Sequence, residues 1–295
     1  MQPEQLRTGK TDSNHPTGIA IVSEHVEMLS QGRDHLLLHS MAALLEHPFL
    51  LFLVTLVLLC AASRTGVAFR RWLRKPDSAL DEDHFDLVLG ATLTLLGLII
   101  GFTFSMSMNR YDQRKDREED EANAIGTEYL RLDVLPSKDA RIARILMREY
   151  LQRRIIFYTT RDTELLRRCH AETSQLEAKL WIAVLPYAQA QPSGISALLL
   201  SGMNDVFNSQ GYAEAIWKNR VPAPAWSLLI ALAVFSNFLV SCRSQKNRAG
   251  VLLVLPVVLS ISFFLIAEID SPRSGIIRIH ARNLESLTNV LSAGE

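Results

Sequence analysis

Four long apolar blocks constrain the fold of this chain more than any other feature of its sequence. They occupy about residues 44–63, 87–108, 224–240 and 250–267. A helix of about 20 mostly apolar residues crosses a bilayer core of about 30 Å. We therefore expect an all-α integral membrane protein with four transmembrane helices, because the remaining amphipathic chain is too short to bury four such helices in a soluble fold.

The four blocks pair as two hairpins. Residues 64–86 join the first two blocks, residues 241–249 join the last two, and a polar insert separates the hairpins. Because the number of spans is even, both ends of the chain and the insert lie on one side of the membrane. The predicted organisation is a polar N-terminal tail (1–43), transmembrane hairpin one (44–108), a helical insert (109–223), transmembrane hairpin two (224–267) and an amphipathic C-terminal segment (268–295).

The basic residues next to the spans bear on the orientation of the chain. The short loops carry Arg64, Arg70, Arg71, Arg74, Lys75, Arg243, Lys246 and Arg248. The positive-inside rule places such short loops in the cytoplasm. The insert side, however, also has basic residues close to the span ends, namely Arg110, Arg114, Lys115, Arg117, Lys218, Arg220 and Arg273. The charge pattern therefore leaves the side of the insert open.

Charge and cysteine content exclude several classes of protein. The 31 basic residues balance 31 acidic ones, which argues against a general nucleic-acid binder. Three cysteines cannot build a disulfide framework. His35 and His39 stand four residues apart, but no further ligand completes a metal site, and no nucleophile with its base or phosphate-binding loop is visible. We therefore expect neither an enzyme nor a bound cofactor or metal.

The polar insert shows helical periodicity and no strand-like alternation. Three helices are predicted at about 137–158, 162–185 and 193–219, with Ser137 and Asp162 as N-caps of the first two. The insert is therefore predicted to be an antiparallel helical bundle that continues from the membrane helices.

The second span combines small and polar residues. Gly97 and Gly101 form a pair of small residues four apart, which lets helices approach closely, and Ser105 begins a more polar exit from the membrane. Two interpretations remain open. The glycines could pack against another helix of the same subunit, or the span could line a pore, with its glycines near the axis and its hydroxyls toward water.

A charged helical extension is predicted to follow the second span without a break. Residues 87–131 would form a helix about 67 Å long, which projects well beyond the hydrocarbon. Arg114, Glu121 and Glu128 recur every seven residues and would share one face. That face would belong either to a solvated rod whose charges pair four residues apart, as Arg114 with Glu118 would, or to a charged vestibule around an axis of several copies.

The end of the fourth span carries acidic residues at the membrane boundary. Glu268 and Asp270 lie there, with Arg273 close by. Acids at that depth are costly unless they are paired or hydrated. The sequence leaves two options, an ion pair with Arg273 or a site beside a water-filled path. Residues 276–291 then form an amphipathic segment, suited to packing on the insert or lying at the interface.

Four stretches of the chain carry a family resemblance: "GFTFSMSMNRYDQRK", "EEDEANAIGTEYLR", "NRVPAPAW" and "DSPRSGIIRI". They resemble bacterial membrane proteins with the bestrophin-like domain of unknown function, over about residues 85–285. The resemblance implies a multi-pass protein of the bacterial inner membrane, with lipid and further copies of itself as partners. It also implies kinship with bestrophins, pentameric anion channels whose second span lines the pore and whose insert is cytoplasmic.

Bestrophins have aromatic constrictions along the pore, and Phe102 and Phe104 are the only candidates for them in this span. The calcium clasp of bestrophins has no evident counterpart here.

The sequence therefore leaves two functional hypotheses. The first is a homo-oligomer that conducts inorganic ions along Gly97, Gly101, Phe102, Phe104 and Ser105; the resemblance to bestrophins implies anions. The alternative is a non-enzymatic membrane scaffold or sensor that binds a partner through the insert.

Overall fold

A computed structural model describes residues 47–73, 82–243 and 249–293. The described residues belong to one compact unit that covers residues 44–295. Their regular elements are all helical, which confirms the predicted all-α class. The N-terminal tail, with His35 and His39, lies outside the described residues.

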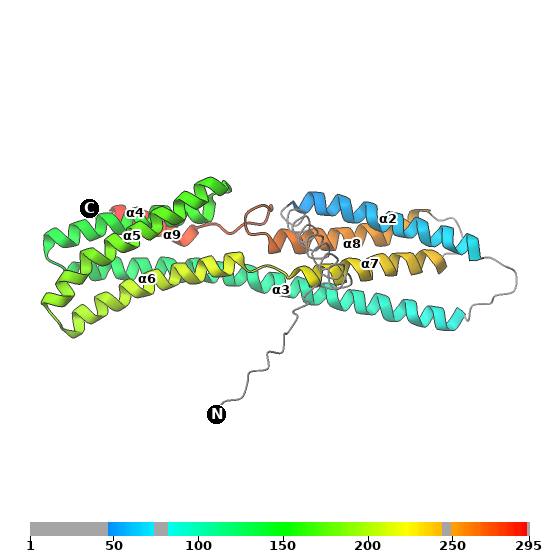
Figure 1. The fold of residues 1–295 in the computed structure, drawn as a ribbon, viewed down its shortest axis with the longest axis horizontal. Coiled ribbons are helices and arrows are strands. Elements are labelled where there is room, and N and C mark those ends of the chain that lie inside the picture. The colour runs from blue at the N-terminus through cyan, green and yellow to red at the C-terminus, as the bar shows by residue number, and fades with distance from the viewer. Residues whose placement is uncertain (1–46, 74–81, 244–248, 294–295) are drawn as a thin grey trace, which may run out of the picture. The chain divides into compact units, whose positions relative to one another are not determined.

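Among the described residues, four helical spans are long and apolar enough to cross a membrane, as the sequence predicts. The helices that form them are α2 (Pro48–Leu73), α3 (Glu82–Arg131), α7 (Ala223–Arg243) and α8 (Ala249–Asp270). In the membrane bundle, α2 and α3 each pack against both α7 and α8 (Figure 1). At Gly66 of α2, an added Cβ atom would lie 2.5 Å from the carbonyl oxygen of Phe238, so glycine is what lets α2 and α7 approach this closely.

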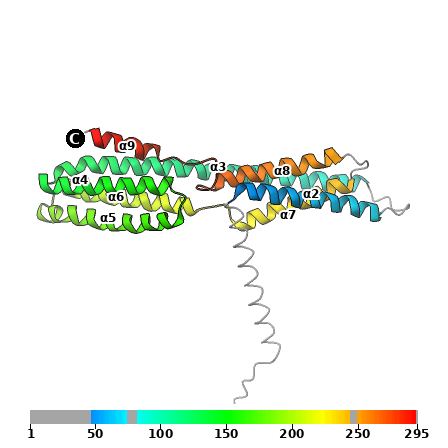
Figure 2. The same cartoon turned by 90° about the horizontal axis from the view of Figure 1, so that it is seen from above.

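The helix α3 continues from the membrane bundle into a second bundle, formed by the insert (Figures 1 and 2). At 50 residues it is about 75 Å long, which confirms the predicted unbroken extension. The insert adds α4 (Ser137–Thr159), α5 (Thr163–Ala190) and α6 (Gly194–Lys218), and the chain ends with α9 (Arg282–Ala293). A 3₁₀ turn, η1 (Leu132–Val134), separates α3 from α4.

The helix boundaries in the insert largely follow the predicted caps. The Asp162 side chain accepts hydrogen bonds from the backbone of Glu164 and Leu165, which confirms it as the N-cap of α5. Ser137 is the first residue of α4 rather than its N-cap, because Pro136 occupies that position. The prediction for α5 ended too early, since the helix continues through Pro186 to Ala190.

The described part of the C-terminal segment contains one helix. Residues 271–281 are irregular, and α9 begins at Arg282, within the amphipathic segment predicted at 276–291. The apolar residues of α9 join the core of the insert, where Leu284 is fully buried. Of the two predicted placements, packing on the insert is therefore the one observed.

Candidate functional site

The candidate site follows α3, because this helix runs through both bundles and carries most of the predicted site residues. Its two opposite faces have very different surroundings. One face is buried by other helices of the same subunit from Leu96 to Glu128. The other is open over the membrane-spanning half.

The open face contains every residue that the sequence assigns to the second-span site. Gly97, Gly101, Phe102, Phe104 and Ser105 are all exposed in the subunit. A Cβ atom added at either glycine would meet no heavy atom within 4 Å. The interpretation that these glycines pack inside the same subunit is therefore wrong, and the small-residue face remains free for other copies of the chain or for water.

The opposite face of the same helix segment is buried against α7 and α8. Leu96, Thr103 and Ser107 lie there, each less than 5% exposed. From Ser107, steps of seven residues lead past the membrane to Arg114, Glu121 and Glu128, and Glu118 lies one turn after Arg114; all four are buried as well. From Leu96 to Glu128, one seam of α3 thus faces neighbouring helices, although its residues change from apolar to charged.

Arg114 lies where the two bundles meet and binds the ends of two helices. Its guanidinium donates to the carbonyl oxygens of Asn219 at 2.9 Å and Asp270 at 3.2 Å. Weaker bonds reach the carbonyls of Ile216 at 3.4 Å and Ile269 at 3.3 Å. Because the C-terminal carbonyls of a helix lack partners within it, an arginine here satisfies the ends of α6 and α8 together.

Asp270 provides the complementary contact at this junction. Its two carboxylate oxygens accept from the backbone N–H of Val221 at 3.1 and 3.0 Å. Arg110 lies 3.5 Å from one of the same oxygens. The acid therefore holds the short link between α6 and α7 against the end of α8, and it is not paired with Arg273.

Glu268 holds the irregular segment that follows α8. Its carboxylate accepts from the backbone N–H of Ile276 at 2.5 Å and of Ile277 at 3.4 Å. Gly275 lies so close to this carboxylate that an added Cβ atom would collide with it. One oxygen of Glu268 has no partner among the described residues.

Arg273 lies apart from both acids and binds the insert. It donates to the carbonyl oxygens of Phe157 at 2.6 Å and Thr160 at 3.1 Å, at the end of α4. Its guanidinium lies over the rings of Phe157 and Trp217. The predicted ion pair between Arg273 and the boundary acids is therefore wrong, because each of these groups caps backbone instead.

Glu118 acts in the same way on the last helix. Its carboxylate accepts from the backbone N–H groups of Asn283 at 2.9 Å and Leu284 at 3.0 Å, and from the Asn283 side chain at 2.7 Å. This contact satisfies the first turn of α9. Burial raises the pKa of Glu118, against the lowering effect of these hydrogen bonds.

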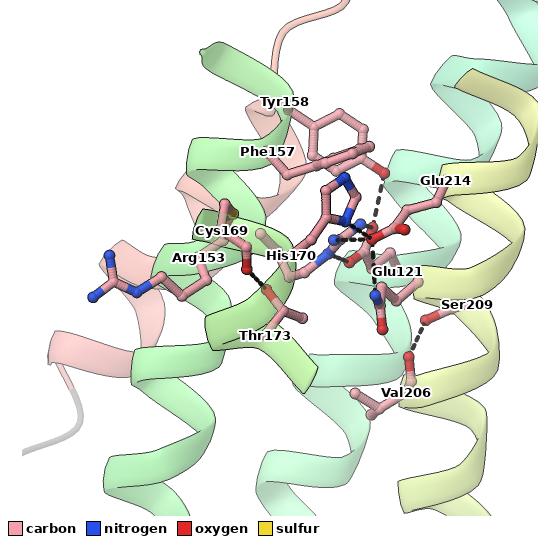
Figure 3. A network of polar contacts seen from close by, with 12 residues as sticks. Glu121, Arg153, Phe157, Tyr158, Cys169, His170, Thr173, Val206, Ser209 and Glu214 are labelled. Atoms are coloured by element: carbon pink, nitrogen blue, oxygen red, sulfur yellow. Dashed lines mark hydrogen bonds and ion pairs between the residues drawn. The ribbon is translucent and has the colours of Figure 1, made fainter. Parts of the chain in front are cut away.

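Glu121 is the centre of a buried polar network in the insert (Figure 3). Its carboxylate forms a short ion pair with Arg154 and accepts from the Tyr158 hydroxyl at 2.8 Å. Arg154 also pairs with Glu214 at 3.0 Å, and Glu214 lies 3.2 Å from the ring nitrogen Nδ1 of His170. Burial alone would lower the pKa of Arg154, but the charge of Glu121 and the bonds to it raise the pKa above its ordinary value.

Glu128 lies in a tighter environment nearer the end of α3. It pairs with Arg131 at 3.4 Å, and its other oxygen has no partner among the described residues. A Cβ atom added at Gly202 of α6 would collide with the carboxylate, so glycine makes room for it. Burial raises the pKa of Glu128 to about 7, and burial does the same for Glu177 of α5.

These contacts bear directly on the predicted vestibule. Arg114, Glu121 and Glu128 point into the subunit, and their burial argues against both the solvated rod and a charged vestibule. Exposed acids lie on the other face of α3 instead, at Asp112, Asp116 and Glu119. The seven-residue spacing of the three predicted residues does indicate a shared face. That face is the one that Leu96, Thr103 and Ser107 already mark as buried.

No cluster of three or more His, Cys, Asp or Glu side chains that could hold a metal ion occurs within residues 47–73, 82–243 and 249–293. The buried acids are engaged by arginines, a tyrosine or backbone N–H groups. This arrangement suits the fixing of helix ends within the subunit.

Comparisons with known proteins agree with this architecture. The family model of the bestrophin-like domain matches residues 54–284. The fold resembles the crystal structure of a bacterial bestrophin homolog from Klebsiella pneumoniae, with 16% identity, a TM-score of 0.57, and 81% of this chain and 95% of that chain covered.

Two further structures are similar to this chain. A single-residue variant of the Klebsiella pneumoniae protein has 16% identity and a TM-score of 0.60, covering 83% of this chain and 99% of that chain. A structure described as a membrane protein has 15% identity and a TM-score of 0.61, covering 82% and 99%. No curated protein matches the chain.

Proposed function

The chain belongs to the bestrophin-like family, and from this premise we propose that it assembles into a homo-oligomeric ion channel whose path follows the open face of α3. The solved structures that share its fold include a bacterial bestrophin homolog. The resemblance to bestrophins suggests the activity, which is passive movement of inorganic ions across a cell membrane.

The observation that carries this proposal is the exposure of the membrane half of α3. Only 11% of its apolar window is buried inside the subunit, whereas the other three spans bury 33%, 39% and 44% of theirs. The exposed side also contains Gly97, Gly101 and Ser105 rather than large apolar residues alone. A purely lipid-facing surface has no need of glycines and hydroxyl groups, whereas a face turned toward the axis of an oligomer leaves space beside its glycines and offers its hydroxyl groups to water.

The same face continues beyond the membrane as a line of carboxylates. Gly101, Ser105, Asp112, Asp116 and Glu119 follow one another at spacings of four, seven, four and three residues, and all are exposed. Such positions share one side of a helix. Copies arranged around an axis would therefore place rings of Asp112, Asp116 and Glu119 at the mouth, where they would concentrate cations.

This line of acids gives the proposal an ion preference that differs from the anions implied by the resemblance. Lys115 lies on the same side of α3 and partly offsets the acids. Three carboxylates against one ammonium still leave a negative surface in each copy. We therefore propose that cations pass more readily than anions.

Ion flux through liposomes that contain the purified protein tests the path. Gly101→Leu should abolish the flux while the oligomer remains assembled, because the larger side chain would project from the open face. Gly211→Leu is the matched control, since Gly211 lies in α6 of the insert with nothing within 4 Å of an added Cβ. Undiminished flux in Gly101→Leu, with assembly intact, would remove α3 as the path.

Ion preference is tested separately with salt gradients. The double variant Asp112→Asn/Glu119→Gln should lower the ratio of cation to anion permeability several-fold. The double variant Glu149→Gln/Glu285→Gln removes the same charge from exposed positions elsewhere on the insert and should leave the ratio unchanged. If no gradient of any ion produces flux and crosslinking recovers a stable partner, the channel proposal fails and the scaffold function takes its place.

A further inference from the structure

A groove lies between α2 and α8 at the end of the membrane bundle that carries the short loops. It encloses about 520 Å³. Its α2 wall includes Cys60, Arg64, Val67 and Arg71, and its α8 wall is formed by Leu252 and Leu253. Neither the open face of α3 nor the polar network of the insert contributes to this groove.

The groove straddles the level at which hydrocarbon gives way to lipid headgroups. The helix α2 begins at Pro48, near the insert end of α8, where the rings of Phe49 and Phe264 are 5.1 Å apart. From Pro48, Arg64 is about 24 Å and Arg71 about 35 Å along the axis, so a core about 30 Å thick that begins at Pro48 ends between the two arginines. Trp72, which is 79% exposed, follows Arg71, as expected for a residue of an interfacial aromatic belt.

The two arginines of the groove differ from the other described cations at this end of the bundle. Arg243 pairs with Asp86 at 2.9 Å, and Arg70 donates to the carbonyl oxygen of Arg243 at 3.5 Å. Arg64 and Arg71 have no ion pair or hydrogen bond within the described part of the chain. They are seven residues apart and therefore lie on the same face of α2, about 10 Å from each other along its axis.

The groove therefore combines two chemistries side by side. Two free guanidinium groups suit a phosphate, which they bind with paired N–H donors. The apolar wall of Val67, Leu252 and Leu253 suits hydrocarbon and has nothing to offer a free inorganic ion. The deeper Arg64 can extend its side chain toward the headgroup level, where Arg71 already lies.

We propose that this groove binds one anionic phospholipid in each subunit. Arg64 and Arg71 hold the lipid phosphate, and Val67, Leu252 and Leu253 contact the first methylene groups of an acyl chain. The bound lipid would tie the ends of α2 and α8 together next to the short loops. This inference is independent of ion conduction, because its test measures lipid retention alone.

Native mass spectrometry of the full-length protein in detergent tests the proposal. The purified protein is mixed with dioleoyl-phosphatidylglycerol or dioleoyl-phosphatidylcholine at equal concentration. The wild-type chain should retain phosphatidylglycerol at one molecule per subunit and at least fivefold more than phosphatidylcholine. Arg64→Gln/Arg71→Gln should lose this preference. Arg70→Gln should keep it, since Arg70 lies in the same turn as Arg71 and does not line the groove.

Two further measurements distinguish a lipid from other occupants. Ala68→Phe fills the groove but keeps both arginines, so it should reduce phosphatidylglycerol retention. Ala61→Phe is its control and should keep the retention, because it places the same side chain on the exposed surface of α2 outside the groove. Excess inorganic phosphate should not displace the lipid. Equal retention of the two lipids by the wild type, or full displacement by phosphate, would overturn the proposal. Retention in the arginine double variant equal to that of Arg70→Gln would also overturn it.

Discussion

The two halves of α3 bury the same seam with different chemistry. In the membrane half the seam consists of Leu96, Thr103 and Ser107, and the Ser107 hydroxyl has no partner among the described residues. In the insert half the buried residues include Arg114, Glu118 and Glu121, all engaged by hydrogen bonds or ion pairs. The buried face thus continues along the helix from one half to the other. The neighbours that a polar group finds there decide whether an apolar or a charged residue can occupy a buried position.

The difference follows from where helix ends lie. Charged groups next to a helix terminus can satisfy backbone N–H or carbonyl groups that have no partner within the helix. Arg114 meets the carbonyl ends of α6 and α8, and Glu118 meets the N–H groups of α9. The middle of a membrane span offers no such ends, so apolar and small hydroxyl residues occupy the seam there.

Removing a buried carboxylate from the insert should produce the largest effect. Glu121→Ala leaves Arg154 with one fewer partner in a buried site and should lower the free energy of unfolding by about 3 kcal/mol. Chemical unfolding in detergent, followed by circular dichroism, measures the change. Asp120→Asn is the matched control, because the exposed Asp120 pairs only with the exposed Arg117; its effect should stay below about 1 kcal/mol.

A double variant sharpens this result. Glu121→Leu/Arg154→Met replaces the pair with apolar side chains and should recover much of the stability lost in Glu121→Ala. Recovery would show that the pair is needed to avoid a lone buried charge, not for its own attraction. If Glu121→Ala unfolds at the same denaturant concentration as Asp120→Asn, the contrast between the two halves of α3 has no energetic basis.

A second, smaller effect concerns pH. Burial raises the pKa of Glu128 from an ordinary 4.5 to about 7. At Glu128 the folded chain therefore binds more protons than the unfolded chain between these values, so the contribution of this group to stability is greatest below pH 4.5 and is lost as the pH rises through 7. The expected loss from Glu128 is about 2 kcal/mol between pH 5 and pH 8.

Glu128→Gln isolates this contribution from other titrations. The variant should lose less stability than the wild type between pH 5 and pH 8, because a neutral side chain then occupies the buried site at every pH. Unfolding curves at several pH values, compared with those of the exposed-site variant Asp120→Asn, measure the difference. A wild-type profile that rises over this interval would contradict the assignment.

The sequence specified the membrane architecture well because apolar length and helical period are local properties. It predicted the four spans, the unbroken course of α3 and the capping role of Asp162. The partners of the charges escaped prediction, since Glu118 binds Asn283 and Arg114 binds Asn219 across more than a hundred residues of chain. Rules for pairs four residues apart describe the surface of an isolated helix, whereas Arg114, Glu118 and Glu121 lie on the face of α3 that other helices cover.

The smallest effect compares the same substitution in the two halves of the molecule. Alanine replaces glycine inside a helix with a gain of up to about 1 kcal/mol when space allows. Gly97→Ala, on the open membrane face, should therefore leave stability unchanged or slightly raised, since nothing lies within 4 Å of its added Cβ. Gly202→Ala should destabilise the insert, because its Cβ would displace the buried carboxylate of Glu128. Unfolding of both variants in detergent measures the contrast, and a destabilised Gly97→Ala that also loses its oligomer would show that the open face packs against a neighbouring copy instead of facing water.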